Sequence, residues 1–198
     1  MNKPFAQSSE ENKQPILAVL AERLKNAHSV LEIGSGTGQH AVYFAGQMPH
    51  LQWQTSDLAM MQPGIQLWLD EAGLDNVLPP LALDVMLAMS WPEQCYDAVY
   101  SANTAHIMSE DAVAAMFAGV GNVLNSGGQF LLYGPFMIDG KHTAPSNQRF
   151  DLWLRQQDPH QGVRDLVWLQ KLADDAGMTF AEDVKMPVNN RILIWRKQ

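Results

Sequence analysis

A glycine-rich turn between an apolar run and a helical segment is the feature that most constrains this chain. The run from Ser29 to Ile33 leads directly into Gly34-Ser35-Gly36-Thr37-Gly38, and residues 41–45 then place apolar side chains at helical spacing. A strand, a glycine turn and a helix in this order form the nucleotide-binding unit of doubly wound α/β folds, because glycines let a ligand approach the backbone. Taken alone the turn is a weak signal, since a tight turn without a ligand has the same pattern.

Strand and helix patterns alternate along the rest of the chain. After a polar, loose start at residues 1–11, an amphipathic helix is expected to begin at Pro15. Two strands at 179–184 and 191–195, joined by a hairpin-like reversal, are expected to close the chain. We therefore predict an α/β fold: a doubly wound, mostly parallel seven-stranded sheet with helices on both faces and an antiparallel last strand. The other expected strands are 29–33, 51–55, 81–83, 96–101 and 129–133, and the other expected helices are 63–72, 111–124, 147–156 and 164–176.

Charge and cysteine content exclude several classes of protein. Lys and Arg total 13 against 21 Asp and Glu, a net charge of −8, which argues against binding nucleic acid or an anionic membrane through charge. The single cysteine, Cys95, excludes an intrachain disulfide and a multi-cysteine zinc cluster, and no His, Asp and Glu spacing resembles a metal site. Without a signal-like or membrane-length apolar segment, we expect a cytoplasmic protein with no membrane partner.

Polar residues follow the expected strands at their carboxyl ends, where ligands bind in such sheets. Asp57 follows the second strand, where a carboxylate can accept both hydroxyls of a ribose, and Asn103 follows the fourth. Asp84 follows the third strand, where it can accept a hydrogen bond from an exocyclic amine. Both aspartates could instead cap helices, but their placement after successive strands favours ligand binding.

The glycine spacing differs from that of dinucleotide-binding proteins. Their fingerprint needs Gly or Ala at position 39, where this chain has Gln39, and Gly38 comes one position too early. A nicotinamide-dependent oxidoreductase is therefore the weaker alternative.

The glycine turn resembles motif I of class I S-adenosylmethionine-dependent methyltransferases, with the sequence Glu32-Ile33-Gly34-Ser35-Gly36-Thr37-Gly38. The later motifs of these enzymes are matched in order by Asp57, Leu83-Asp84-Val85 and residues 97–103. The whole chain is similar to a small methyltransferase-like family of undefined activity, the methyltransferase-like 26 type of bacteria and animals. Two departures are a missing second acidic residue shortly after Asp57 and Val188 in place of Ala, and neither touches the implied cofactor contacts. The segments that carry this resemblance are Asn12-Lys13, Pro15-Ile16-Leu17, 30–45, 49–57, 132–136, Ser146-Asn147, Phe150-Asp151, Asp158-Pro159, 162–165, Met186-Pro187 and Asn189-Asn190.

This resemblance implies S-adenosylmethionine as cofactor and S-adenosylhomocysteine as its product. The glycines would lie against the methionine part, the aspartate after the second strand would hold the ribose, and the aspartate after the third, with the next amide, would hold adenine. Glu32 would act from behind the turn, through water or backbone amides. The cofactor-binding residues implied are Glu32, Gly34, Gly36, Gly38, Asp57, Leu58, Asp84, Val85 and Asn103.

The sulfonium of this cofactor is already a strong methyl donor, so the protein mainly has to align it with an acceptor. A general base is needed only if the acceptor loses a proton. His106, after the fourth strand, is the candidate for that base or for orienting the acceptor, although a lone histidine is more often structural. Tyr133 could point its hydroxyl into the pocket or anchor the turn at Gly134-Pro135.

The stretch 140–165 is dense in polar residues for a connection between core elements. As a substrate-binding wall, Asn147, Arg155 and Arg164 would offer donors to an anionic or carbonyl-bearing substrate. The alternative is a salt-bridged insertion, with Arg155 paired to Asp158 and Arg164 to a neighbouring carboxylate. Asn189 and Asn190 could reach the same rim or only form a turn.

The length of 198 residues fits a single domain. Its expected parts are an N-terminal segment and helix at 1–28, a cofactor-binding core at 29–135, a substrate-side insertion at 136–165, and a closing helix and strand pair at 166–198. The resemblance implies S-adenosylmethionine-dependent methyl transfer, and the few residues that remain for binding a macromolecule favour a small-molecule acceptor. A non-catalytic cofactor-binding or scaffold protein on the same fold is the main alternative. The sequence identifies neither the acceptor nor the oligomeric state.

Overall fold

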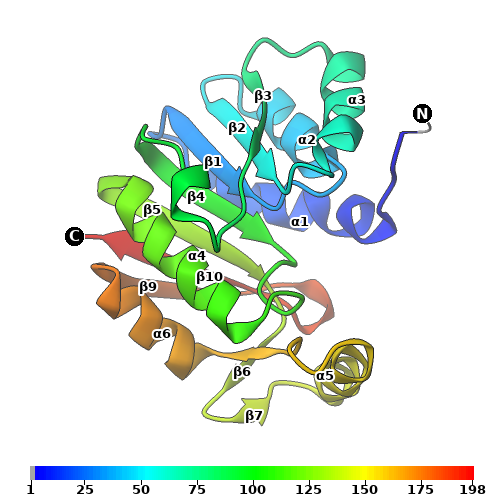
Figure 1. The fold of residues 1–198 in the computed structure, drawn as a ribbon, viewed down its shortest axis with the longest axis vertical. Helices are drawn as coiled ribbons and strands as arrows, with labels where there is room; N and C mark the ends of the chain where they lie inside the picture. The colour runs from blue at the N-terminus through cyan, green and yellow to red at the C-terminus, as the bar shows by residue number, and fades with distance from the viewer. Residues whose placement is uncertain (1–2) are drawn as a thin grey trace.

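The computed structural model describes residues 3–198. A seven-stranded sheet lies at the centre of the protein (Figure 1). Its strand order is β3-β2-β1-β4-β5-β10-β9. The last strand, β10, runs antiparallel to both β5 and β9, while the remaining neighbours pair in parallel. The predicted mixed, doubly wound sheet is therefore confirmed. The strands are β1 (Ser29–Ile33), β2 (Gln52–Asp57), β3 (Val77–Ala82), β4 (Tyr96–Ala102), β5 (Leu124–Gly134), β9 (Met178–Lys185) and β10 (Arg191–Lys197).

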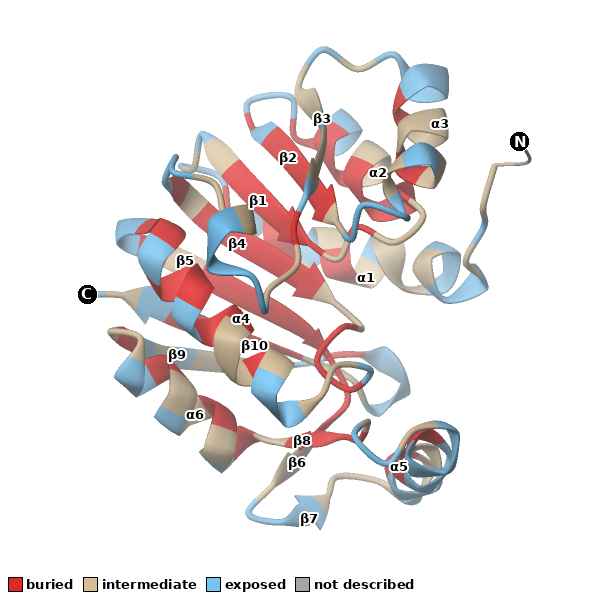
Figure 2. Cartoon of the chain, in the orientation of Figure 1, coloured by how far each residue is buried: buried red, intermediate tan, exposed pale blue. Residues whose placement is uncertain are grey.

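Helices cover both faces of this sheet, which forms the buried centre of the molecule (Figure 2). On one face α1 (Gln7–Arg23) and α2 (Gln39–Gln47) pack on the sheet, with α3 (Gln62–Ala72) beside α2 and β3. On the other face lie α4 (Glu110–Val123) and α6 (Leu166–Asp175). Two hydrophobic clusters result, one on each face, so helices on both faces of the sheet are confirmed.

The central strand shows why these sequences bury both faces. Successive side chains of a strand point to opposite faces, and β1 places apolar side chains on both of them. Val30 joins the cluster under α1 and α2, whereas Leu31 and Ile33 join the cluster under α4 and α6. All three are buried, which fixes the register of the strand that carries the glycine turn.

The N-terminal segment is ordered where the sequence suggests a loose one. Helix α1 begins at Gln7 and includes Pro15 in its interior, so the expectation of a helix starting at Pro15 is wrong. Tertiary contacts hold this segment: the Trp68 indole donates to the Pro4 carbonyl (2.7 Å), and the Ala6 amide donates to Gln39 Oε1 (2.6 Å). Such contacts between distant residues leave no local sequence signal. Met1 and Asn2 lie outside the described residues.

The insertion at 136–165 forms a small second sheet and a helix at the carboxyl end of β5. This sheet has the order β7-β6-β8, and it holds Arg164 and Asp165 as the short strand β8. The helix expected at 164–176 therefore begins only at Leu166, where the Asp165 carboxylate caps it by accepting from the Val167 amide (2.8 Å). The insertion comprises β6 (Phe136–Ile138), β7 (Lys141–His142), α5 (Pro145–Gln157) and β8 (Arg164–Asp165), and two 3₁₀ turns lie elsewhere, η1 (Ala88–Ser90) and η2 (Pro187–Asn189).

None of the helices formed by residues 3–198 is both long enough and apolar enough to cross a membrane.

Candidate functional site

A cavity of about 560 Å³ lies at the carboxyl ends of the central strands. From β1 the chain proceeds outward to β2 and β3 and then returns to β4 on the other side, so the strand order reverses between β1 and β4. That reversal is where open α/β sheets bind ligands. We call this space the glycine-loop cavity. Of the residues that the sequence implies for cofactor binding, those that line it are Glu32, Gly34, Gly36, Asp57, Leu58, Asp84, Val85 and Asn103.

The glycine turn is built for close approach. Gly34 has φ +73°, and a Cβ at this position would lie 2.5 Å from Thr104 Cγ2, so no larger residue fits. Gly36 has φ +58° and would direct a Cβ into open space, with nothing within 4 Å. Gly38 is not among the residues that line the cavity; its Cβ would meet Ile65 at 3.3 Å, so this glycine lets α2 start close to α3.

Asp57 joins the end of β2 to the glycine turn. Its Oδ2 accepts from the Gly36 amide (2.7 Å) and its Oδ1 from the Leu58 amide (2.7 Å). Burial raises the pKa of Asp57, and the Gly36 and Leu58 amides oppose that rise. Helix α3 has Met61 as its N-cap, without a side-chain cap bond, so Asp57 is no helix cap. Its carboxylate lies at the cavity with lone pairs left for a ligand's hydroxyls.

Asp84 also lines the glycine-loop cavity, on the turn after β3. Its Oδ1 accepts from the Met86 amide (3.0 Å), which closes a local turn. The short helix that follows has Leu87 as its N-cap, so Asp84 does not cap it either. Neither aspartate therefore caps a helix, and each keeps carboxylate lone pairs at the cavity that can accept hydrogen bonds from a ligand.

Glu32 supports the turn from behind. It is buried in the sheet, and its Oε2 accepts from Ser35 Oγ (2.9 Å) and from the Trp53 indole (3.1 Å). Ser35 Oγ in turn accepts from the Ser56 amide (3.2 Å), so one carboxylate links β1, β2 and the turn. Burial raises the pKa of Glu32 to about 7, against the hydrogen bonds from Trp53 and Ser35. This geometry agrees with a supporting role through neighbouring groups.

A second cavity of about 510 Å³ adjoins the first. It shares Ser8 and Asn103 with the glycine-loop cavity and extends toward the insertion. We call it the asparagine cavity, because four of its residues are asparagines. Both sequence-predicted catalytic residues and one predicted substrate residue meet there. The lining residues are Ser8, Glu11, Asn12, Pro15, Asn103, His106, Tyr133, Pro135, Ser146, Asn147, Phe150, Pro187, Val188 and Asn190.

Asn103 marks the boundary between the two cavities. Its backbone is left-handed (φ +59°), which is uncommon for a residue other than glycine, and its amide donates to the Tyr133 carbonyl (2.9 Å). This bond joins the end of β4 to the end of β5. Strained residues held by their surroundings are frequent at functional sites, and this one lies where the two cavities meet.

His106 is buried at the asparagine cavity, and its ring lies in a T-shaped contact with the ring of Phe150, with ring centroids 5.2 Å apart. Burial, with a smaller contribution from the Arg164 cation, lowers the pKa of His106 to about 4. The imidazole is therefore uncharged at neutral pH, which is the form that can accept a proton or a hydrogen bond.

Tyr133 lines the same cavity, and its hydroxyl accepts from Asn190 Nδ2 (2.9 Å). Burial raises the pKa of Tyr133, and hydrogen bonds from Asn190 and Asn12 oppose the rise. The hydroxyl thus belongs to a hydrogen-bond network at the cavity.

Arg155 and Arg164 lie outside both cavities, unlike Asn147. The Arg164 side chain is 3% exposed, and its guanidinium donates to the carbonyls of Ala105 (3.1 Å), Met108 and His160 (2.7 Å). Its pairing with Glu110 (3.4 Å) agrees with the salt-bridge alternative. Arg155 binds Asp151 (3.1 Å) rather than the expected Asp158. The structure therefore assigns both arginines to holding the insertion together.

The first turns of α1 form a roof over both cavities. Ala6 and Ser9 line the glycine-loop cavity, Glu11 and Asn12 line the asparagine cavity, and Ser8 lines both. Asn12 Oδ1 lies 2.7 Å from His40 Nε2, which fastens the roof to α2. In the sequence, this segment is marked by the pair Asn12-Lys13 of the family resemblance.

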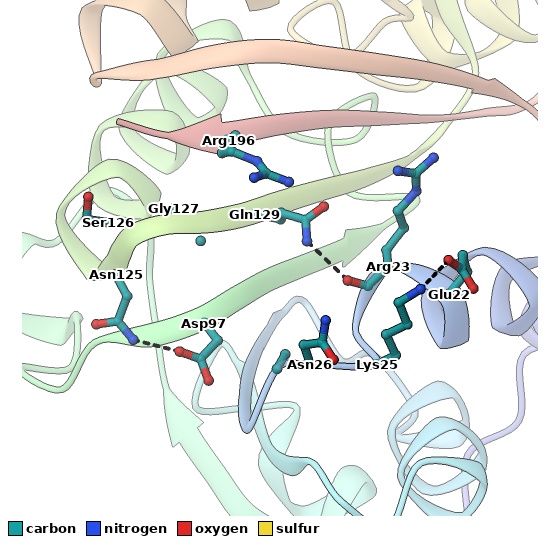
Figure 3. A pocket seen from close by; sticks show the side chains of 12 residues that line it. Glu22, Arg23, Lys25, Asn26, Asp97, Asn125, Ser126, Gly127, Gln129 and Arg196 are labelled. Atoms are coloured by element: carbon teal, nitrogen blue, oxygen red, sulfur yellow. Dashed lines mark hydrogen bonds and ion pairs between the residues drawn. The ribbon is translucent and has the colours of Figure 1, made fainter.

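A third hollow, of about 500 Å³, lies at the amino ends of β4 and β5, opposite the glycine turn. Figure 3 shows its polar side chains bonded to one another: Asn125 to Asp97, Lys25 to Glu22, and Gln129 to the Arg23 carbonyl. Because these groups satisfy each other and face away from the strand ends that bind ligands, we do not place the site there.

Known structures share this fold. An O-methyltransferase family protein from Burkholderia thailandensis superposes with a TM-score of 0.83 at 18% identity, over 94% of this chain and 56% of that one. Human N-acetylserotonin methyltransferase in complex with SAM gives 0.80 at 16% identity, over 96% and 53%. The mitomycin 7-O-methyltransferase MmcR gives 0.84 at 16% identity, over 96% and 54%. The chain thus spans about half the length of these structures, and at such identities they establish the fold alone.

A family model described as "Protein of unknown function (DUF938)" matches residues 3–197. Since this match covers nearly the whole sequence, the chain belongs to the DUF938 family.

Proposed function

We propose that this protein transfers a methyl group from S-adenosylmethionine to a small-molecule acceptor. One observation carries the proposal: the glycine-loop cavity at the strand-order reversal adjoins a second cavity, and the strained Asn103 lines both. A donor and an acceptor molecule could therefore meet at a single boundary. Each space lies within the roughly 300–1,000 Å³ typical of small-molecule sites.

The residues of the glycine-loop cavity fit this cofactor. The open space at Gly36 would receive the methionine part against the backbone, and Asp57 would accept the ribose hydroxyls. Asp84 and the Val85 amide would hold the adenine amine and ring, with Leu58 beside them as an apolar wall. Gly34 keeps the turn close to Thr104, and Glu32 keeps the turn in place.

When bound, S-adenosylmethionine supplies a methyl group activated on a sulfonium, so the protein's task is alignment. Asn103 would set the boundary at which the two reactants approach. The uncharged His106 would orient an acceptor and take the proton that an O–H or N–H group releases. Tyr133 would position the acceptor through its hydroxyl.

Two sequence-level expectations belong to the same proposal. The chain would be a DUF938 member of the methyltransferase-like 26 type, as its motif series implies. With its single cysteine and net charge of −8, it would work in the reducing cytoplasm on an acceptor other than nucleic acid.

Isothermal titration tests the proposal and its rivals. The protein should bind S-adenosylmethionine and S-adenosylhomocysteine with comparable affinity, and Asp57→Ala should weaken both at least tenfold while the far-UV spectrum is unchanged. Saturable NADH binding without S-adenosylhomocysteine binding would instead favour the oxidoreductase alternative. Tight cofactor binding without methylated product, across acceptors that occupy the asparagine cavity, would favour the non-catalytic alternative.

A further inference from the structure

The asparagine cavity has an unusual charge inventory for a site expected to recognise an anion. Among residues 3–198, Glu11 is the one acidic residue that lines the cavity, and neither Lys nor Arg lines it. The lowered pKa of His106 leaves that ring uncharged at neutral pH. Arg155 forms an ion pair with Asp151, and Arg164 donates hydrogen bonds to backbone carbonyls. A carboxylate or phosphate entering here would lose its water without meeting a cation.

Its hydrogen-bonding groups suit an uncharged ligand that both donates and accepts hydrogen bonds. Asn147 is buried, and both hydrogens of its amide are used, one on Thr143 Oγ1 (3.1 Å) and one on the Asn189 carbonyl (3.0 Å). What Asn147 offers a ligand is therefore its side-chain oxygen, an acceptor. Tyr133 Oη accepts from Asn190, so what it offers is its own hydrogen.

Part of the remaining lining is apolar. Pro15, Pro135 and Pro187 line the cavity from three separate segments, and Phe150 lines it with an aromatic ring that contacts His106. Rigid rings lose little conformational freedom when they pack against a planar ligand. These walls favour a ring-bearing acceptor of modest size.

From these contacts we infer that the asparagine cavity selects a ring-bearing acceptor that is neutral or positively charged and donates hydrogen bonds, and that it discriminates against carboxylates and phosphates. That the ligand is a methyl acceptor rests on the proposed function, but the charge preference is a property of the cavity itself. The preference is set by the exposed Glu11, by the oxygen of Asn147 and by the lack of a cation among the lining residues of the described part of the chain.

Three probes with the same hydroxyphenyl group and different charge test it: tyramine (positive), 4-methylphenol (neutral) and 4-hydroxyphenylacetate (negative). Affinities are read by NMR titration of ¹⁵N-labelled protein, with the side-chain amide signals of Asn147 and Asn190 reporting that the probe is in the cavity. We expect the first two to bind, and the carboxylate to bind at least about tenfold more weakly than tyramine. A carboxylate that binds as well as tyramine, or failure of all three to shift these signals, would overturn the inference.

Charge variants on α1 sharpen the test. Glu11→Gln should weaken tyramine about threefold to tenfold and leave 4-methylphenol unchanged, since only the charge at the cavity is altered. Glu22→Gln makes the same change in net charge at the far end of the helix, outside both cavities, and should alter neither probe. Equal effects of the two variants would also contradict the inference. Each titration is run with and without S-adenosylhomocysteine. If S-adenosylhomocysteine does not bind, the proposed function is wrong. The order of affinities of the three probes still tests the charge preference of the cavity.

Discussion

Asp57 Oδ2 accepts a hydrogen bond from the Gly36 amide at 2.7 Å, which links the end of one strand to the glycine turn after its neighbour. The same carboxylate accepts from Leu58 through its other oxygen. One side chain thus shapes the backbone of the cavity and presents charge to it. This coupling explains why the turn and the aspartate, 21 residues apart, act as one site.

Gly36→Ala should separate the cost of folding from the cost of binding. Both Gly36 and Gly73 have φ +58° with open space around a new Cβ, so alanine at either position should cost about 1 kcal/mol of unfolding free energy. Only the methyl at position 36 would enter the glycine-loop cavity, so Gly36→Ala alone should weaken S-adenosylhomocysteine at least tenfold. Urea unfolding and calorimetric titration of both variants check this. Equal cofactor affinity in the two variants would refute the placement of Gly36.

Glu32 should make stability depend on pH. Because its pKa is raised to about 7 in the folded protein, its favourable contribution is present at acid pH and is lost as pH rises through about 7. Glu32→Gln removes this ionisation but keeps an oxygen for Ser35 and Trp53. Between pH 5 and pH 8.5, the free energy of unfolding of the variant should therefore increase by on the order of 3 kcal/mol relative to that of the wild type.

Urea unfolding of both proteins at the two pH values measures this difference, and the histidines contribute equally to each protein, so their titration cancels. A difference between wild type and Glu32→Gln that does not change with pH would mean that Glu32 ionises normally.

Arg164→Gln should destabilise the fold strongly. It removes a buried guanidinium that serves the carbonyls of Ala105, Met108 and His160, and unpaired buried acceptors cost about 1–3 kcal/mol each. We expect a loss of roughly 3 kcal/mol in the free energy of unfolding. Arg155→Gln is the matched control, because that side chain is 45% exposed and its single ion pair should be worth less than about 1 kcal/mol. Similar losses for the two variants would show that Arg164 is not the internal clamp described above.

Asn12→Ala should loosen the roof formed by α1. The side chain bonds His40 at 2.7 Å and faces the Tyr133 hydroxyl, so its loss should cost about 1–2 kcal/mol and speed amide hydrogen exchange in residues 7–15. Gln14→Ala, an exposed change on the same helix, should leave exchange unchanged. Protection that stays the same in Asn12→Ala would mean that other contacts alone hold the roof.

Local patterns were enough to predict the sheet and one side of the site. The glycine turn follows an apolar strand, and Asp57 and Asp84 follow the next two, so the rule that ligands bind at the carboxyl ends of strands was sufficient to bring these residues together. The central strands are buried on both faces, so their sequences are runs of apolar residues, and such runs predict strands.

Residues whose role depends on distant partners could not be predicted in this way. Nothing near Arg164 in the sequence shows that three carbonyls surround it, so it resembled a ligand-binding cation. Asn12 lies in a polar stretch with a proline, and its contacts with α2 and β5 help to make that stretch a roof. Gly38 matches the glycine pattern, yet it serves packing against Ile65.

The crystal structure of the protein with S-adenosylhomocysteine tests the central claim most directly. The account predicts that the ribose hydroxyls bind Asp57, that adenine lies between Asp84 and Leu58, and that the sulfur faces the asparagine cavity at Asn103. A product molecule bound elsewhere, or bound with its sulfur turned away from Asn103, would contradict the claim that the two cavities hold donor and acceptor.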